Sequence, residues 1–123
     1  MSARNNDEDR IREIYRVVQE TLELFASENP ESLRNPHKGE DLLKADGLAM
    51  RVLRVGEEMG RLSREAEAYG FYGIAEAAEM RNIIAHAYWS IDRSVVVDTV
   101  VHDFPALLQA CTNYADAYGF EFD

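Results

Sequence analysis

Apolar residues recur at helical spacing along almost the whole of this 123-residue chain, and few folds can accommodate such a pattern. A first segment, about residues 7–27, places its apolar residues at Ile11, Ile14, Tyr15, Val18, Leu22 and Phe25. A second, about residues 41–69, places them at Leu48, Val52, Val55, Met59, Leu62 and Ala66. A third runs from about residue 73 to 88, and the last ends near residue 118. The sequence therefore predicts an all-α fold, an antiparallel bundle of four to five helices in a single domain spanning residues 1–123.

Pro, Gly and acidic residues mark the ends of the first predicted helix and of the chain. Residues 28–40 contain two X-Pro steps and a glycine, which predict a surface loop. The acidic residues from Asp7 to Asp9 are expected to cap the first helix or to lie at the positive end of its dipole. Residues 119–123 follow the last helical pattern and are expected to form a loose tail.

The segment Val95-Val-Val-Asp-Thr-Val-Val is rich in β-branched residues, which favour strands. We interpret it as helix because its surroundings are helical and the sequence offers no second strand to pair with it. Ser90 and Asp92 are candidate N-caps before it. Asp103-Phe-Pro predicts a new cap, with proline in the first turn of the last helix.

Charge and cysteine content exclude several classes of protein. Acidic residues outnumber basic ones by 23 to 13, a formal net charge of −10, whereas a free-standing nucleic-acid-binding domain is usually basic. A small basic cleft on an acidic body remains possible. The chain has a single cysteine, Cys111, which excludes intrachain disulfides and multi-cysteine zinc sites. Cys111 lies in the apolar stripe of the last predicted helix, so we expect it to be a small buried hydrophobic residue. Neither a signal peptide nor an apolar membrane span is found, so we expect a cytosolic protein without membrane contact.

The second predicted helix carries a row of arginines opposite its apolar stripe. These are Arg51, Arg54, Arg61 and Arg64. Glutamates interleave with them, so one interpretation is a solvated face laced with salt bridges. The other is a surface that contacts RNA or a protein partner.

The third predicted helix holds the most informative cluster. At about 100° per residue, Arg81, Asn82 and His86 share the face away from its buried stripe, with only the small Ala78 and Ala85 between them. Histidine can accept and donate protons near neutral pH, and arginine binds phosphoryl groups. Asparagine can hydrogen-bond to the histidine or to a substrate hydroxyl and so orient it. Such a set could support metal-free RNA cleavage by the 2′-hydroxyl, and a symmetric dimer would supply a second histidine. The alternative is an ordinary exposed polar helix face.

Tyr88 lies far around a continuing helix from His86, and it joins the same face only if the helix ends after Ala87. Otherwise it is a boundary residue of the core with its hydroxyl outward. His37 is expected to be exposed, and His102 to cap a helix or lie at the surface. No Gly-rich phosphate loop and no convincing metal-ligand spacing is present, so we expect neither a metal nor a cofactor.

The segment Arg81-Asn-Ile-Ile-Ala-His-Ala-Tyr matches the motif of the HEPN superfamily, and the chain resembles its HepT-like branch. That motif is Arg, four residues, His, any residue, Tyr, usually with Asn after the Arg. The resemblance includes Val55-Gly-Glu-Glu-Met-Gly-Arg-Leu-Ser and Asp103-Phe-Pro-Ala-Leu, and covers roughly residues 8–115. It departs at Tyr69-Gly-Phe-Tyr-Gly-Ile-Ala-Glu, where relatives often carry a turn with Pro and Trp.

This resemblance implies a homodimeric, metal-independent endoribonuclease that acts as the toxin of a prokaryotic toxin–antitoxin pair. It implies that Arg81 and His86 are catalytic and that Asn82 supports them. It further implies that a small nucleotidyltransferase of the MNT type neutralises the toxin by adding AMP to Tyr88. One alternative is a HEPN dimer with little activity that binds the nucleotidyltransferase; another is a purely structural bundle. Whether the RNA target is tRNA or mRNA stays open at this stage.

Overall fold

The computed structural model describes residues 3–71 and 92–122. In chain order their elements are α1 (Ala3–Phe25), α2 (Pro30–Arg34), α3 (Gly39–Met59), the 3-10 helix η1 (Arg64–Tyr69), α5 (Arg93–Asp98), the π-helical turn η2 (Thr99–Asp103) and α6 (Phe104–Tyr118). All these elements are helical, and the two described ranges contain no strand. The predicted all-α fold is therefore confirmed. The third predicted helix, residues 73–88, and the candidate cap Ser90 lie outside the described residues.

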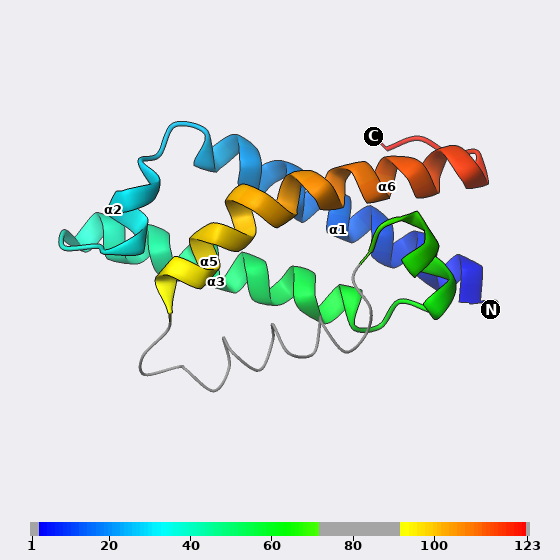
Figure 1. Cartoon of the computed structure of the whole chain (residues 1–123), viewed down its shortest axis with the longest axis horizontal. Helices are drawn as coiled ribbons and strands as arrows, with labels where there is room; N and C mark the ends of the chain where they lie inside the picture. Colours follow the sequence, from blue (N-terminus) through cyan, green and yellow to red (C-terminus); the bar gives the residue numbers. More distant parts are fainter. Residues whose placement is uncertain (1–2, 72–91, 123) are drawn as a thin grey trace.

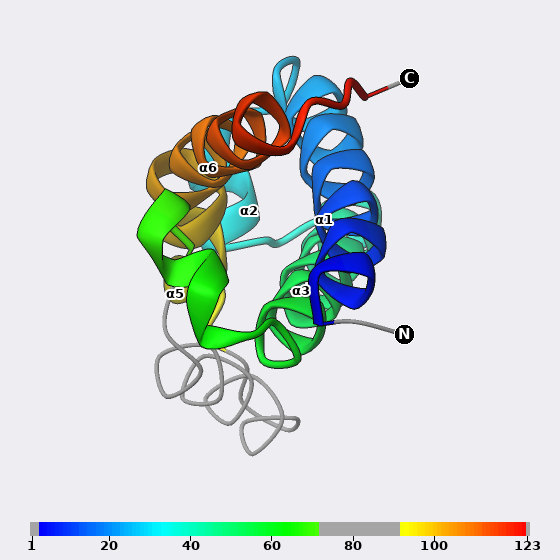
Figure 2. The same cartoon turned by 90° about the vertical axis from the view of Figure 1, so that its right-hand side faces the viewer.

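The long helices form an elongated bundle around one apolar core (Figure 1). Helix α1 runs antiparallel to both α3 and α6 and packs against each of them (Figures 1 and 2). The short helix α2 packs against α3 and α5, and η1 packs against α6. The core combines the predicted stripes of the first, second and last helices; its largest fully buried side chains include Tyr114, Phe104, Ile11, Ile14, Leu33, Met59 and Leu107.

The sequence predicts a second helix that continues to about Tyr69, but α3 ends at Met59. The chain then turns and continues as η1, whose end at Gly70 has a left-handed φ of 110° that glycine adopts readily. Leu62 and Ala66 remain buried in spite of the break. In a 3-10 helix, residues three apart lie on the same side, so Ala66 can still face the core although the helix type changes.

The expected loop at residues 28–40 contains the short helix α2. The Asn29 side chain caps it by accepting a hydrogen bond from the Glu31 N–H at 3.0 Å, and Leu33 anchors it in the core. The tail after Gly119 was expected to be loose, but it packs back onto α1. The Phe122 ring stacks on Tyr15 with centroids 4.0 Å apart. A cap and a buried leucine therefore order the first segment, and an aromatic contact orders the tail.

Residues 93–118 form one continuous helical run that includes the β-branched segment, which confirms that this segment is helical. Asp92 caps the run as predicted, accepting hydrogen bonds from the N–H groups of Ser94 and Val95 at 3.1 and 3.3 Å. Asp103 occupies the N-cap position of α6 with Pro105 in the first turn, as predicted, but its backbone is helical and its side chain makes no capping hydrogen bond. The wider π turn just before Pro105 accommodates a residue that lacks the N–H of a regular α-helix.

Candidate functional site

The motif residues Arg81, Asn82, His86 and Tyr88 lie outside the described residues. The structure does define the positions from which that part of the chain departs and to which it returns. Phe71 is buried in the core at 4% exposure, and the Cβ of Ala110 lies 3.3 Å from where a Cβ on Gly70 would stand. On the other side, Asp92 caps α5. The described residues on either side of the motif, Phe71 and Asp92, therefore hold fixed positions in the bundle.

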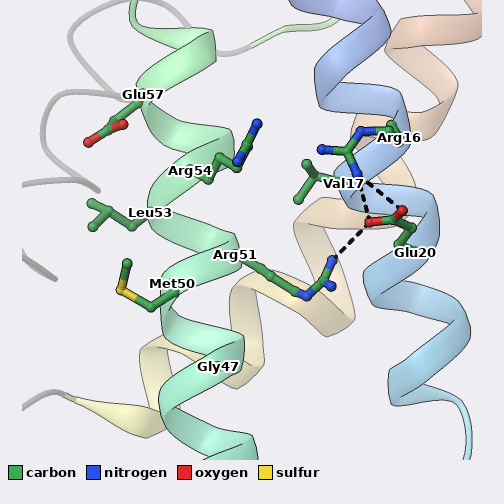
Figure 3. A pocket seen from close by; sticks show the side chains of 9 residues that line it. All are labelled: Arg16, Val17, Glu20, Gly47, Met50, Arg51, Leu53, Arg54 and Glu57. Carbon is green, nitrogen blue, oxygen red and sulfur yellow. Dashed lines mark hydrogen bonds and ion pairs between the residues drawn. The ribbon is translucent and has the colours of Figure 1, made fainter.

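The described residues contain a hollow of about 560 Å³ on the outer surface where α1 and α3 lie side by side (Figure 3). Two of the predicted arginines, Arg51 and Arg54, extend from α3 toward α1, while Met50 and Leu53 extend from the other side of α3. An adjoining hollow of about 260 Å³ shares Gly47 and Arg51 and is lined mainly by apolar side chains. Together the two hollows form a groove along α1 and α3.

The arginines of this groove are bound by glutamates of α1. Glu20 accepts from Arg51 at 3.3 Å and from Arg16 at 3.1 Å (Figure 3). Glu13 bridges Arg16 and Arg54. The hydrogen bond from Arg16, aided by the one from Arg54, lowers the pKa of Glu13 and outweighs the partial burial that would raise it. In turn, the hydrogen bond and charge of Glu13 raise the pKa of Arg16. The groove thus carries alternating charges rather than free cations.

The predicted row of arginines is divided between two places in the structure. Arg51 and Arg54 belong to the groove, whereas Arg61 follows the end of α3 and Arg64 begins η1. Arg61 lies 3.9 Å from Glu58, and both Arg61 and Arg64 are exposed. Because α3 ends at Met59, the four arginines do not form a single helical face. Arg51 and Arg54 are salt-bridged, but to Glu20 and Glu13 of α1 rather than to the glutamates that interleave with them in α3. Their contact with RNA or a partner stays a prediction.

The sequence interpretation missed the contribution of α1 to this groove. Glu13, Arg16 and Glu20 are spaced by three and four residues, which places them on one side of a helix, and this spacing is visible in the sequence. Their partnership with Arg51 and Arg54 is not visible there, since it depends on how two helices pack. The interhelical ion pairs could be recognised only in three dimensions.

Other predicted polar positions have simple structural roles. Cys111 is fully buried, its thiol lies 3.9 Å from the Ile11 carbonyl oxygen, and burial raises its pKa to about 12, so it is the buried hydrophobe that its stripe predicts. His37 and His102 are exposed. Within residues 3–71 and 92–122, no group of three or more His, Cys, Asp or Glu side chains could hold a metal ion. No helix in these ranges is both long and apolar enough to cross a membrane.

Comparison with known families identifies this fold. A family model described as Ribonuclease HepT-like matches residues 6–113. This range includes all the described helices from α2 to η2, most of α1 and α6, and the sequence motif. Comparison with curated proteins and with solved structures finds no match. The family match spans most of the chain, and it agrees with the all-α bundle and with the resemblance carried by the motif. The chain belongs to the HepT-like ribonuclease family.

Proposed function

We propose that this protein is a metal-independent endoribonuclease and the toxin of a prokaryotic toxin–antitoxin pair, acting on RNA in the cytosol. The observation that carries the proposal is the HepT-like ribonuclease match over residues 6–113, a range that includes an intact Arg81-Asn-x3-His86-x-Tyr88 motif. The residue types of that motif suit phosphate chemistry. The non-functional interpretation, an ordinary exposed polar helix face, does not explain why the complete motif occurs in a chain of this family.

The proposed reaction is transesterification within the RNA backbone. The 2′-oxygen attacks the adjacent phosphorus, the bond from phosphorus to the 5′-oxygen breaks, and the products carry a 2′,3′-cyclic phosphate and a 5′-hydroxyl. His86 accepts the proton of the 2′-hydroxyl, and a second histidine returns a proton to the leaving 5′-oxygen. Arg81 stabilises the charge that develops on the phosphoryl oxygens, and Asn82 orients the reacting groups.

A homodimer completes this chemistry, because each chain contributes one motif histidine. In a symmetric dimer the two copies of the motif would face one cleft, and the two copies of His86 would serve as base and acid. The small side chains at positions 78 and 85, if the segment is helical as the sequence predicts, would let the RNA backbone approach the motif. Oligomerisation is therefore part of the proposed mechanism.

The first test is RNA cleavage by the purified protein in the presence of EDTA. We expect the wild type to cleave RNA and His86→Ala to lose at least about 100-fold in rate, because general acid–base catalysis contributes about 10²–10⁴-fold. His102→Ala is the matched control, since His102 is exposed on η2, and it should retain wild-type cleavage.

Loss of cleavage in His86→Ala, with cleavage kept in His102→Ala, would support the proposal. Cleavage that survives in His86→Ala would overturn the catalytic role of this histidine. Complete dependence of the wild type on added divalent metal would overturn the metal-independent mechanism.

The proposed antitoxin is an MNT-type nucleotidyltransferase. The Tyr88 hydroxyl oxygen attacks the α-phosphorus of ATP, AMP is transferred to it, and pyrophosphate leaves with the hydroxyl proton lost to solvent. A phosphodiester beside the RNA cleft adds bulk and negative charge where the substrate phosphate must bind. Incubation with the nucleotidyltransferase and ATP should add AMP to the wild-type chain and stop cleavage. Intact mass spectrometry should show no addition to Tyr88→Phe, while Tyr15→Phe should be modified like the wild type. Modification of Tyr88→Phe would place the acceptor elsewhere.

A second candidate function is a binding module with little nuclease activity, whose main role is to hold the nucleotidyltransferase. The net charge of −10 favours it, as does the pairing of Arg51 and Arg54 with glutamates, since both weaken attraction to RNA. This candidate predicts no cleavage by either wild type or His86→Ala, from protein whose mass shows no modification of Tyr88. It also predicts stable binding of the nucleotidyltransferase by both proteins.

A further inference from the structure

Helix α2 lies at the end of the bundle where α5 begins, and it packs against both α3 and α5 (Figure 1). A helix of five residues is too short to be stable alone, so its surroundings must hold it in place. Leu33 is buried in the core, and the Asn29 side chain caps the helix. Arg34, the last residue of α2, therefore extends from a backbone that is fixed by its neighbours.

The Arg34 side chain reaches from α2 to α5, across 60 residues of sequence. Its Nη1 donates to the Ser94 carbonyl oxygen at 3.3 Å and to the Ser94 hydroxyl at 2.9 Å. The same nitrogen lies 2.7 Å from Oδ1 of Asp98, and Nε lies 3.1 Å from Oε1 of Glu31. A planar guanidinium that is held by several acceptors is fixed in orientation. Arg34 therefore holds both the backbone and the side chains of α5.

A second arginine also joins α5 to the bundle, but less firmly. Arg93 of α5 lies 3.3 Å from one carboxylate oxygen of Asp46, whose side chain is 58% exposed. An isolated ion pair at the surface contributes only about 0–1 kcal/mol to stability. Arg34 differs because it binds a carbonyl, a hydroxyl and a carboxylate of one helix, and its side chain is only 22% exposed. We expect its main effect on where α5 begins rather than on the stability of the whole fold.

The start of α5 follows the sequence motif closely along the chain. Asp92, which caps α5, comes four residues after Tyr88 and six after His86. Four residues span at most about 14 Å even when fully extended, so a shift of Asp92 passes to the motif through a short covalent connection. Catalysis requires accurate placement, since a misplacement of about 1 Å caused far from the chemistry can cost about 100-fold in rate.

We propose that Arg34 is a positioning residue of the ribonuclease. It holds Ser94 and Asp98, thereby fixes the backbone at Asp92, and so sets the point at which the chain returns to the bundle after the motif. In this role Arg34 does not contact RNA, because its donors are occupied within the chain. This inference rests on the proposed function and adds a residue to it.

The first experiment measures kcat and KM for cleavage of one RNA oligonucleotide in EDTA by wild type, Arg34→Ala and Arg12→Ala. We expect Arg34→Ala to lose at least about tenfold in kcat at an unchanged KM, because the reacting groups are misplaced while the RNA contacts remain. Arg12→Ala is the matched control and should behave like wild type. Arg12 also binds a carbonyl oxygen, of Glu121 at 3.1 Å, and a carboxylate, of Glu8 at 3.4 Å, but it holds the tail rather than α5.

Circular dichroism should show the same helix content for all three proteins at the assay temperature, so that unfolded protein does not account for the loss. Asp98→Asn is a milder variant, since it keeps Arg34 and removes the charge of one acceptor. It should also lower kcat at an unchanged KM, and it decides the question if Arg34→Ala does not fold.

The second experiment does not depend on nuclease activity. The chain has one tryptophan, Trp89, which lies between Tyr88 and Asp92 in the sequence, so its fluorescence reports on the connection from the motif to α5. We expect acrylamide quenching of Trp89 to differ between Arg34→Ala and wild type. Quenching in Arg12→Ala should equal that in wild type.

An unchanged kcat in Arg34→Ala would overturn the positioning role. A raised KM at an unchanged kcat would also overturn it and would assign Arg34 to RNA contact. An equal loss in Arg12→Ala, or identical Trp89 quenching in Arg34→Ala and wild type, would contradict a specific link between Arg34 and the motif. A wild type that cleaves no RNA would overturn the proposed function, whereas altered quenching in Arg34→Ala would still support Arg34 as the anchor of this connection.

Discussion

Asp7 shows how one side chain can join parts of the chain that are far apart in sequence. It is only 3% exposed, and its carboxylate accepts hydrogen bonds from the N–H of Ser63, at 2.9 Å, and from the Ser63 hydroxyl. Ser63 immediately precedes η1, so Asp7 of α1 fixes the turn where α3 ends. The expected role of Asp7, a local cap or dipole partner of its own helix, misses this contact across 56 residues.

Removal of this carboxylate should destabilise the fold. Asp7→Ala leaves the Ser63 N–H and hydroxyl without their acceptor, and hydrogen bonds to charged groups contribute about 1.5–3 kcal/mol. We expect the free energy of unfolding, measured by urea denaturation, to fall by about 2 kcal/mol. The control is Asp9→Ala, an exposed acid in the same helix, which should change it by less than about 0.5 kcal/mol. Equal effects of the two substitutions would contradict the assigned role of Asp7.

Helix ends are where the sequence and the structure differ most. The apolar stripe of Leu48 to Ala66 was predicted correctly, because side-chain spacing alone decides which residues face the core. The break at Met59 was not predicted, since the stripe continues through η1 and the acceptor for Ser63 comes from another helix. The start at Asp92 was predicted because its capping contacts are local, to residues two and three positions ahead. Local signals can be read from sequence, whereas contacts between elements cannot.

The two aspartates flanking the β-branched segment give a matched test of this distinction. Asp92→Ala removes the cap of the helical run and should lower the free energy of unfolding by about 1 kcal/mol. Asp103→Ala should change it by less than about 0.5 kcal/mol, because Asp103 lies inside the run and caps nothing. Thermal and urea denaturation of both variants measure the difference. A larger loss in Asp103→Ala than in Asp92→Ala would mean that a new helix does begin at Asp103.

At the scale of the whole molecule, periodicity and composition predicted the all-α class. The motif, together with the resemblance over about residues 8–115, predicted the family. The role of the arginines was left open between salt bridges and RNA contact, because the glutamates that bind Arg51 and Arg54 belong to α1. The groove depends on the packing of α1 against α3. The sequence shows which residues each helix contributes to such a surface, but not which residues of the two helices lie next to each other.

The central claim is that this fold cleaves RNA through the RNA's own 2′-hydroxyl. The most direct measurement compares an oligonucleotide that the protein cleaves with the same oligonucleotide carrying a single 2′-deoxy substitution at the cleaved position, both in EDTA. The account predicts that the substituted strand is not cut there, and that the unsubstituted strand yields a 2′,3′-cyclic phosphate and a 5′-hydroxyl. Cleavage of the substituted strand at the same bond, or products that end in a 3′-hydroxyl and a 5′-phosphate, would contradict it.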